Sequence, residues 1–339
     1  MIKKSLPVGK LPPDLLARLL NGIKIDDNRV LLGPGSGLDC AVIEMGDRLL
    51  VLKSDPVTFA SDAIGWYAVQ INANDIATSG AEPRWFLATC LFPPGTNESD
   101  IRIIARQLTT ACSALGISLV GGHTEITHGI DHPIINGTMI GETDREHLIT
   151  PRGAAPGDLI LLTKGVPIEA IALLAREFPE KLRQILGVKK QIEAADYLTS
   201  PGISILRDAR IACDAGIVNA MHDPTEGGLA GALWELAEAS GRQLIIEPQK
   251  VFISSLASEV CSLFQLDPLA CLASGSLLLT VPASDAGKIA QALSTAGIRC
   301  DIIGHVKEGK PGLTTLEDGK RRTLPRPERD EIAKLFQIE

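Results

Sequence analysis

The sequence predicts a mixed α/β or α+β protein built from two domains. Its 339 residues exceed the usual size of one domain and suggest two domains of roughly 150 to 190 residues. Apolar residues make up 45% of the chain but aromatic residues only 4%, so the core is expected to consist mainly of Ile, Leu, Val and Ala. Strand-like and helix-like segments alternate along the chain, which is typical of layered folds rather than helical bundles.

Turn signals and hydrophobic periodicity define the elements of the first half. Gly46 and Asp47 separate two apolar runs and predict a β-hairpin. Ser61 or Asp62 is expected to cap a long helix that ends at Gly80, because apolar residues recur between them at helical intervals. In order, we expect a helix at 14–21, strands at 41–44 and 49–52, a helix at 61–80, a strand at 85–91, a helix at 99–115, and strands at 117–120 and 133–140.

A stretch rich in proline and glycine at 150–158 marks the predicted boundary between a first domain, 1–150, and a second domain, 151–339. The second domain repeats the mixture of elements. We expect strands at 159–163, 217–220, 243–247, 276–281 and 299–304, and helices at 168–177, 202–214, 228–240, 254–265 and 284–296.

Charge and hydropathy exclude several classes of function. The chain has 33 Lys and Arg against 41 Asp and Glu, with no long basic run, which argues against nucleic-acid binding. No apolar stretch approaches the roughly 18 residues of a membrane span, and the N-terminal segment lacks the apolar core of a secretory signal. The seven cysteines show no Cys-x-x-Cys spacing, which argues against a disulfide framework or a zinc knuckle. We therefore expect a soluble cytoplasmic protein with no membrane partner.

One segment places polar residues at the start of a predicted helix. Asp223, Thr225 and Glu226 stand directly before Gly227 and Gly228. A helix N-terminus exposes unpaired N–H groups, and glycines remove the side chains that would keep an anion at a distance. The segment therefore suits a phosphate and its metal, although an ordinary N-cap arrangement is equally compatible with it.

Other acidic and amide residues stand near the ends of predicted elements. Asn72 and Asp75 are three residues apart on a predicted helix and share a face, while Asp39 follows a glycine-rich loop and Asp55 ends an apolar strand. Scattered oxygen ligands without paired His or Cys describe a hard cation such as Mg²⁺ bound together with substrate phosphates. Each aspartate taken alone is equally well read as a solvated turn residue. No Gly-x-x-x-x-Gly-Lys-[Ser/Thr] motif occurs, so a bound nucleotide would not lie in a P-loop.

In this order, the motifs resemble the superfamily of aminoimidazole ribonucleotide (AIR) synthetase. That superfamily includes selenophosphate synthetase, thiamine-monophosphate kinase and the hydrogenase maturation factor HypE. The resemblance runs from about Gly37 to Val306 and is closest to HypE. It rests on three segments, Asn74-Asp-Ile-Ala-Thr-Ser-Gly-Ala-Glu-Pro83, Asp223-Pro-Thr-Glu-Gly-Gly-Leu-Ala and Leu272-Ala-Ser-Gly-Ser-Leu-Leu.

The resemblance implies a PurM-like architecture. The N-terminal AIR synthase-like domain would bind ATP, dimerise and contribute strands to a β-barrel shared with a second subunit, and a C-terminal α/β domain would pack beside it. ATP and Mg²⁺ would lie in the cleft between the domains, near the interface of a homodimer. The implied metal ligands are Asp39, Asp55, Asp75 and Asp223. The implied ATP-binding residues are Asp39, Asn72, Asp75, Gly121, Gly122, Asp223, Thr225, Gly227 and Gly228, and the implied catalytic residues are His123, Glu125 and Glu226.

The resemblance also implies an activity. Members of the superfamily activate an acceptor by phosphoryl transfer, in which positioning and charge neutralisation do most of the work. We therefore expect an ATP-dependent enzyme acting on a small-molecule or protein-borne acceptor. A small-molecule kinase similar to thiamine-monophosphate kinase, and a nucleotide-binding dimeric scaffold without turnover, are the alternatives.

The sequence departs from its relatives at several points. HypE carries its reacting group on a terminal cysteine, whereas the last cysteine here is Cys300, so we expect that carrier to come from a separate protein if it is used at all. Leu38 precedes Asp39 where relatives often have two adjacent carboxylates, which affects metal affinity or stoichiometry. The loop 33–37 has no thiol or lysine, which disfavours selenium chemistry. His123 stands where a close HypE relative would have aspartate, and it either orients a phosphate or acceptor or caps a strand.

Overall fold

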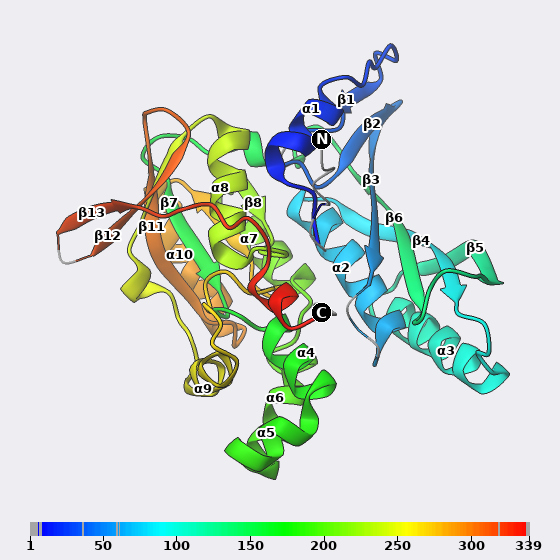
Figure 1. The fold of residues 1–339 in the computed structure, drawn as a ribbon. Helices are drawn as coiled ribbons and strands as arrows, with labels where there is room; N and C mark the ends of the chain where they lie inside the picture. The colour runs from blue at the N-terminus through cyan, green and yellow to red at the C-terminus, as the bar shows by residue number, and fades with distance from the viewer. Residues whose placement is uncertain are drawn as a thin grey trace, which may run out of the picture.

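The computed structural model describes residues 6, 9–35, 37–58, 60, 62–317 and 319–336, and it contains two β-sheets that are separate in sequence. The first sheet lies in the N-terminal half and the second in the C-terminal half, with helices packed on and between them (Figure 1). This mixed architecture confirms the predicted fold class. The division at residue 150 stays a prediction.

The first sheet has six strands in the order β1-β2-β3-β6-β4-β5. They are β1 (Val30–Leu32), β2 (Ala41–Met45), β3 (Arg48–Val57), β4 (Glu82–Phe92), β5 (Ser118–Ile126) and β6 (Ile134–Thr143). Strands β2 and β3 form the predicted hairpin, and β3 continues beyond the predicted end to pair antiparallel with β6 over its length. Within the described part of this single chain the sheet is open, and β1 and β5 are its two edges.

Helices cover one face of the first sheet. They are α2 (Ile64–Thr78) and α3 (Glu98–Ala114), while α1 (Pro13–Leu20) precedes the sheet in the chain. Helix α2 is buried almost all round, because one side lies on β3 and β6 while the other contacts α7 (Leu206–Ala215) and β8 (Ala220–His222) of the second half. Asn74 of α2 joins the two halves, since its Nδ2 donates to the Ile203 carbonyl at 2.7 Å and its Oδ1 accepts from the Ile205 amide at 3.0 Å.

The second sheet has seven strands in the order β13-β12-β9-β11-β7-β10-β8. Besides β8 they are β7 (Leu159–Thr163), β9 (Gln243–Ile246), β10 (Leu278–Val281), β11 (Cys300–Lys307), β12 (Gly312–Glu317) and β13 (Lys320–Thr323). Alternate residues of β7 pack on opposite faces: Ile160 joins the apolar cluster under α8 (Gly228–Ser240), and Leu161 joins the cluster under α7 and α10 (Ala283–Thr295). The second half is therefore a sheet with helices on both faces.

Three more helices, α4 (Glu169–Glu177), α5 (Pro179–Leu186) and α6 (Val188–Ala195), form a small group that packs with α9 (Ser255–Phe264). After β13 the chain runs back across α8 and ends near the middle of the molecule (Figure 1). The indole Nε1 of Trp234 donates to the Leu324 carbonyl at 2.9 Å and holds this returning segment on α8. A short 3₁₀ helix at Glu331–Lys334 follows.

The predicted start of the long helix is wrong by one or two residues. Helix α2 begins at Ile64, and Ala63 before it has a positive φ of 57° and makes no side-chain cap. Asp62 lies outside the helix, because its carboxylate is paired with Arg176 of α4 instead. Ser61 lies outside the described residues. The sequence also missed five elements: β1, α5, α6, β12 and β13.

None of the helices in the described part of the chain is long and apolar enough to cross a membrane.

Replacing Asn74 by alanine is expected to weaken the junction between the two halves. The substitution leaves a buried amide and a buried carbonyl without partners, so the free energy of unfolding should fall by about 2–3 kcal/mol. Urea unfolding followed by circular dichroism measures the change. The control is Asn28→Ala in an exposed turn, expected to stay within about 0.5 kcal/mol of wild type. Equal stability of the two variants would contradict the role given to Asn74.

Candidate functional site

Four carboxylates from separate segments gather between the two sheets, and two of them, Asp75 and Asp223, are buried. Asp39 lies in the loop before β2, Asp55 in β3, Asp75 in α2, and Asp223 directly after β8. Asp75 and Asp223 are only 2% and 1% exposed, so each needs a partner to remain charged. The family resemblance implied that these four residues share a site, and the structure shows which partners they have.

Lys53 of β3 stands between two of them. Its Nζ lies 3.2 Å from Oδ2 of Asp75 and 3.4 Å from Oδ2 of Asp55. Burial alone would lower the pKa of Lys53, but the two carboxylates outweigh it and hold that pKa well above its usual range. Asp55 and Asp75, predicted as metal ligands, are thus paired with a lysine in this structure. The sequence analysis gave Lys53 no role, although its spacing of two from Asp55 on a strand places their side chains on one face.

His222 forms the second buried cation. Its Nδ1 lies 2.8 Å from Oδ2 of Asp39, and its Nε2 lies 2.9 Å from Oε2 of Glu235 on α8. The imidazole is fully buried, which by itself would lower its pKa, but the two carboxylates raise that pKa well above 6.5. In turn the imidazolium outweighs the effect of burial and lowers the pKa of Glu235 to about 2. His222 is therefore an imidazolium that balances two carboxylates, and the sequence analysis missed it.

Asp223 is the carboxylate left without a partner. Neither of its oxygens has a hydrogen-bond partner among the described residues. Burial, followed by repulsion from Asp39, raises its pKa to about 7. One donor atom each from Asp39, His222 and Asp223 lies within 4.8 Å of the others, the spacing of a metal site. Since the imidazolium has no lone pair to offer, the two carboxylates are the groups that would hold a cation such as Mg²⁺.

Asn72 is used structurally. Its Oδ1 accepts from the Asp55 amide at 3.0 Å, while its Nδ2 donates to the carbonyls of Ala68 at 2.9 Å and Asp55 at 3.2 Å. The side chain is completely buried and ties β3 to α2. Asn72 therefore positions Asp55, and both its oxygen and its nitrogen have protein partners.

The glycine-rich turn lies where the sequence predicted it, but its amides already have partners. The Gly227 amide donates to Oδ2 of Asp330 at 2.7 Å, and the Gly228 amide donates to the Thr225 carbonyl at 2.9 Å. Gly228 has a φ of +60°, and a Cβ there would lie 2.5 Å from the Cys271 carbonyl oxygen. Close packing against the segment 269–271, rather than an approaching phosphate, thus explains this glycine.

Asp330 is a partner that the motif did not reveal, because it lies about a hundred positions further along the chain. Its Oδ1 also accepts from the Ile332 amide at 2.9 Å. Burial raises its pKa to about 7, against the effect of these amide hydrogen bonds.

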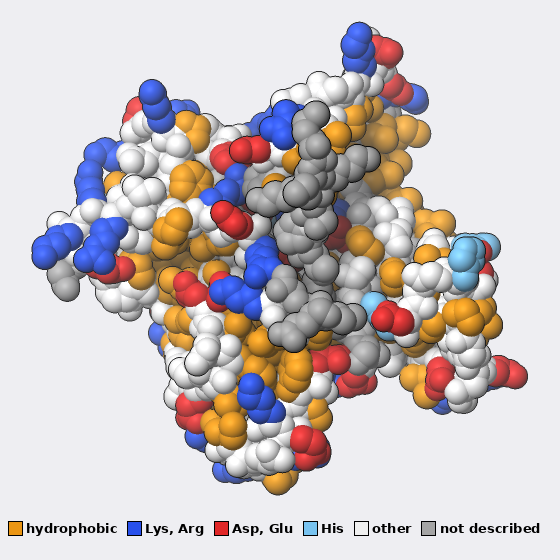
Figure 2. Space-filling view, viewed as in Figure 1, with side chains coloured by type: hydrophobic (Ala, Val, Ile, Leu, Met, Phe, Trp, Pro, Cys, Tyr) orange, Lys and Arg blue, Asp and Glu red, His pale blue; other side chains and the backbone are white. Residues whose placement is uncertain are grey.

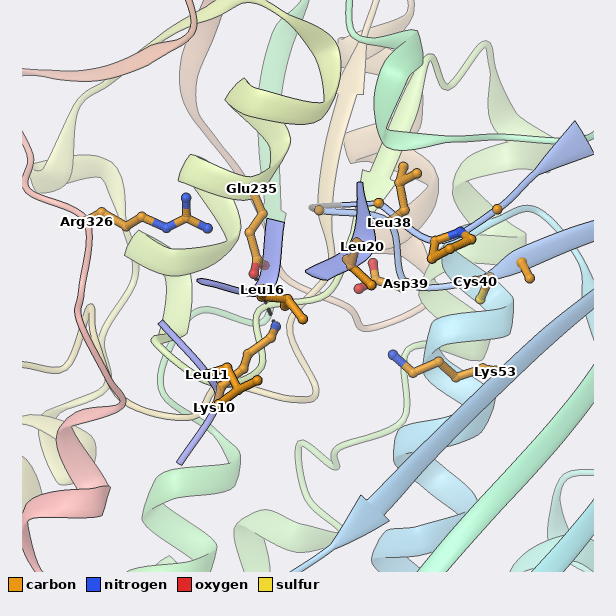
Figure 3. Close-up of a pocket in the computed structure, with 15 residues that line it drawn as sticks. Lys10, Leu11, Leu16, Leu20, Leu38, Asp39, Cys40, Lys53, Glu235 and Arg326 are labelled. Carbon is orange, nitrogen blue, oxygen red and sulfur yellow. Dashed lines mark hydrogen bonds and ion pairs between the residues drawn. The ribbon is translucent and has the colours of Figure 1, made fainter. Parts of the chain in front are cut away.

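Two cavities flank Lys53 and its partners. The first, of about 360 Å³, lies between α1 and α8. Lys10, Lys53 and Arg326 bring positive charge to it, and Lys10 reaches Oε1 of Glu235 at 3.1 Å across it (Figure 3). The close-up also shows Asp39 and Lys53 facing this space. Three cations, the carboxylates Asp39 and Glu235, four leucines and a glycine-rich loop line the cavity, which is large enough for a small ligand.

The second cavity, of about 50 Å³, contains Thr225 and Glu226, which the sequence singled out. Asp55 reaches it from β3, so the Asp55–Lys53 pair stands between the two cavities.

His123 and Glu125 lie elsewhere in the single chain. They sit on the exposed edge strand β5 and pair with each other, Nε2 to Oε2, at 3.0 Å. Strands β4 and β6 separate β5 from β3, a distance of roughly 14 Å at the usual strand spacing. Gly122 lies against β4, where a Cβ would come within 1.9 Å of the Ala88 carbonyl oxygen. The Gly121–Glu125 segment is therefore not brought to the carboxylates within one chain.

Cys40 is buried beside this cluster. Its Sγ lies 3.2 Å from the Asp75 carbonyl oxygen, and burial together with the nearby Asp75 raises the pKa of its thiol. A neutral thiol that donates to the backbone is a packing group rather than a nucleophile.

The two sheets, the carboxylates between them and the glycine-rich turn at 227–228 are together typical of an AIR synthase-like protein. Residues 37–143 match the N-terminal domain of the AIR synthase related proteins, and residues 155–315 match their C-terminal domain. The chain belongs to this family.

Two relatives are similar over most of their length. A provisionally assigned hydrogenase expression/formation protein of Methanocaldococcus jannaschii is 28% identical, with 96% of this chain and 97% of the relative covered. Thiamine-monophosphate kinase of Pyrococcus horikoshii is also 28% identical, with 85% and 88% covered.

Solved structures of HypE share the fold. HypE in complex with ATP has a TM-score of 0.69 and 22% identity, covering 92% of this chain and 90% of that one. HypE in its complex with HypF has a TM-score of 0.74 and 20% identity, covering 91% and 98%.

Replacing Asp223 by asparagine is expected to stabilise the protein in the absence of metal at high pH. Folding raises the pKa of Asp223 to about 7. As the pH rises from the pKa of this carboxyl in the unfolded chain toward 7, the folded protein loses stability, because it must then bury the charge. At pH 8 the variant should exceed wild type by on the order of 2 kcal/mol, and the gap should narrow at pH 5.

Urea unfolding at the two pH values measures this difference. Asp26→Asn in an exposed loop serves as the control and should show no such dependence. A variant that is less stable than wild type at pH 8 would mean that Asp223 has a stabilising partner in solution.

Proposed function

We propose that this protein is an ATP- and Mg²⁺-dependent enzyme that activates an acceptor by phosphoryl transfer. The observation that carries the proposal is Asp223, a buried carboxylate without a partner that faces Asp39 beside the buried cation Lys53. Carboxylates that share a metal with substrate phosphates, next to a lysine, make up the charge balance that phosphoryl transfer needs.

Each residue of the site has a part in this proposal. Asp39 and Asp223 would hold Mg²⁺, which would neutralise phosphate charge when bound. Lys53 would contact the transferred phosphoryl group from between Asp55 and Asp75. His222 keeps Asp39 ionised and in place. Lys10 lies at the mouth of the larger cavity, where it would meet the anionic nucleotide.

The reaction would be a direct displacement. An oxygen of the acceptor forms a bond to the γ-phosphorus, the bond from that phosphorus to the β-bridging oxygen breaks, and ADP leaves with the electron pair. The relatives support the nucleotide: one HypE structure holds ATP, and thiamine-monophosphate kinase is named for a phosphoryl transfer. ATP and Mg²⁺ are abundant in the cytoplasm, which is where we propose the protein acts.

The proposal predicts that Mg-ATP binds to the wild-type protein and that Asp75→Asn weakens it. The substitution keeps the side-chain shape but removes the carboxylate that holds Lys53 at 3.2 Å. Lys53 would then be less well held for its contact with the phosphates of ATP. Loss of a hydrogen bond to a charged group, about 1.5–3 kcal/mol, corresponds to a tenfold or greater loss of affinity for Mg-ATP. Calorimetric titration with and without Mg²⁺ measures it, and Asp26→Asn should bind as wild type does.

Wild-type protein that binds no Mg-ATP would refute the proposal. Labelled γ-phosphate then separates the two enzymatic outcomes, since a stable labelled product indicates a kinase and free labelled phosphate indicates transient activation of the acceptor. ATP binding with no transfer to any acceptor would leave the scaffold alternative.

We also propose a homodimer in which β5 meets a second copy. All nine residues of β5 are exposed, and Leu119, Val120 and Ile126 are 39%, 55% and 56% exposed. A long unpaired apolar edge strand is a surface that proteins cover. Hydrophobic and histidine side chains gather over this edge of the molecule (Figure 2). The dimer would also give His123 and Glu125 a route to a site shared between subunits.

The substitution Val120→Lys is expected to convert the dimer to a monomer, because the buried charge would have no partner in the interface. Analytical ultracentrifugation at several protein concentrations measures the molecular mass. Ile185→Lys is the matched control, since Ile185 is 60% exposed on α5 in the second half. A wild-type protein that sediments as a monomer at all concentrations would rule out this arrangement.

A further inference from the structure

Every charged residue in the described lining of the smaller cavity is acidic. Asp55, Glu169 and Glu226 contribute carboxylates, Thr58, Thr225 and Ser274 contribute hydroxyls, and no Lys, Arg or His of the described chain lines it. The larger cavity on the other side of Lys53 has three cations and two carboxylates in its lining. The two cavities therefore differ in the charge of the ligand that they can accept.

Glu169 is the residue that requires a ligand. It lies at the start of α4, is only 5% exposed, and its Oε2 has no hydrogen-bond partner among the described residues. The Ser274 hydroxyl, 1% exposed, also lacks one. Buried polar groups are nearly always paired in folded proteins, so two unsatisfied groups lining one cavity indicate a missing partner. The nearby motif Leu272-Ala-Ser-Gly-Ser, noted in the sequence, supplies this hydroxyl.

The missing partner is better described as an organic group than as a metal ion. Within the described chain, the one set of three His, Cys, Asp or Glu donors that converges within 4.8 Å is Asp39, His222 and Asp223. The carboxylates of the smaller cavity do not converge in this way. Val57, Ile71, Leu173 and Leu272 form apolar walls between the polar groups, and hydrated cations do not favour such walls.

The size of the cavity limits the group that enters it. One water needs roughly 10–15 Å³ of such volume, so a cavity of about 50 Å³ holds a group of a few heavy atoms. Acceptors on the walls and apolar carbon around them suit a compact nitrogen group that donates several hydrogen bonds.

We propose that this cavity binds the acceptor substrate through a cationic nitrogen group, such as an amine or amidine, which donates hydrogen bonds to Glu169 and Ser274. That the bound molecule is the acceptor rests on the proposed phosphoryl transfer, whereas the binding of a cationic group to this cavity does not. The bound group would lie beside Asp55, one ion pair away from Lys53, and so next to the transferred phosphoryl group.

The charge state of Glu169 supports this assignment. Burial raises the pKa of Glu169 to about 7, the neighbouring Ser274 hydroxyl opposes that shift, and Glu226, Asp330 and Asp223 add to it by repulsion. A cation in the cavity would offset both the burial and the repulsion.

The test uses acetamidinium, which is compact and cationic, and acetamide, its neutral isostere. Ligand-observed NMR titration of the full-length protein should show acetamidinium binding more tightly than acetamide. Glu169→Gln should weaken acetamidinium at least tenfold and leave acetamide nearly unchanged, since the swap keeps shape and removes charge. Ser274→Ala should weaken the binding of both ligands. Glu193→Gln, an exposed glutamate on α6, is the matched control and should bind as wild type does.

Three results would overturn the assignment: wild type that does not bind acetamidinium, binding that survives Glu169→Gln, or displacement of acetamidinium by Mg²⁺ alone. Mg-ATP titration into the same samples separates this from the proposed function. Intact Mg-ATP binding with no amidinium binding refutes only the acceptor site, and amidinium binding without Mg-ATP binding refutes only the phosphoryl transfer.

Discussion

The structure depends on balancing negative charge that is buried between its two sheets. Asp39, Asp75 and Asp223 come from three segments, and the surrounding protein excludes the water that would solvate them. Lys53 and His222 supply the compensation, one from each half of the chain. Lys53 is balanced by Asp55 and Asp75 within the first half, whereas His222 of the second half pairs with Asp39 of the first, so that ion pair forms only when the two halves assemble. Neither cation pairs with Asp223, whose oxygens have no hydrogen-bond partner among the described residues. The site can therefore bind a further cation in addition to its internal ion pairs.

Much of the fold follows from local signals. The hairpin of β2 and β3 and helices α8, α9 and α10 are close to their predicted positions, since turn residues and periodicity mark them. Helices α5 and α6 were missed because they are eight residues long and joined only by Gly187. Strand β13 was missed because all four of its residues are exposed, so it shows no apolar alternation. The predicted start of α2 was wrong because a backbone turn at Ala63, not a capping side chain, precedes that helix.

The sequence predicts several aspartates of the candidate site, but not the residues that pair with them. Motifs located Asp39, Asp75 and Asp223, because short glycine-rich and helix-start patterns carry local information. The roles of Lys53, His222, Glu169 and Asp330 depend on neighbours that are distant in sequence, and no local pattern contains those contacts. Gly228 shows the difference most clearly: the sequence located it correctly, while packing against 269–271, visible only in three dimensions, explains it.

The Asp330–Gly227 hydrogen bond gives the protein a late step in its biosynthesis. A ribosome releases the chain from the N-terminus, and domains fold as they emerge. The turn at 223–228 is made about a hundred residues before the carboxylate that completes it, so it must wait, with a buried amide still unpaired, until Asp330 has left the exit tunnel. A nascent chain can therefore contain every strand of both sheets and still lack the partner of the Gly227 amide.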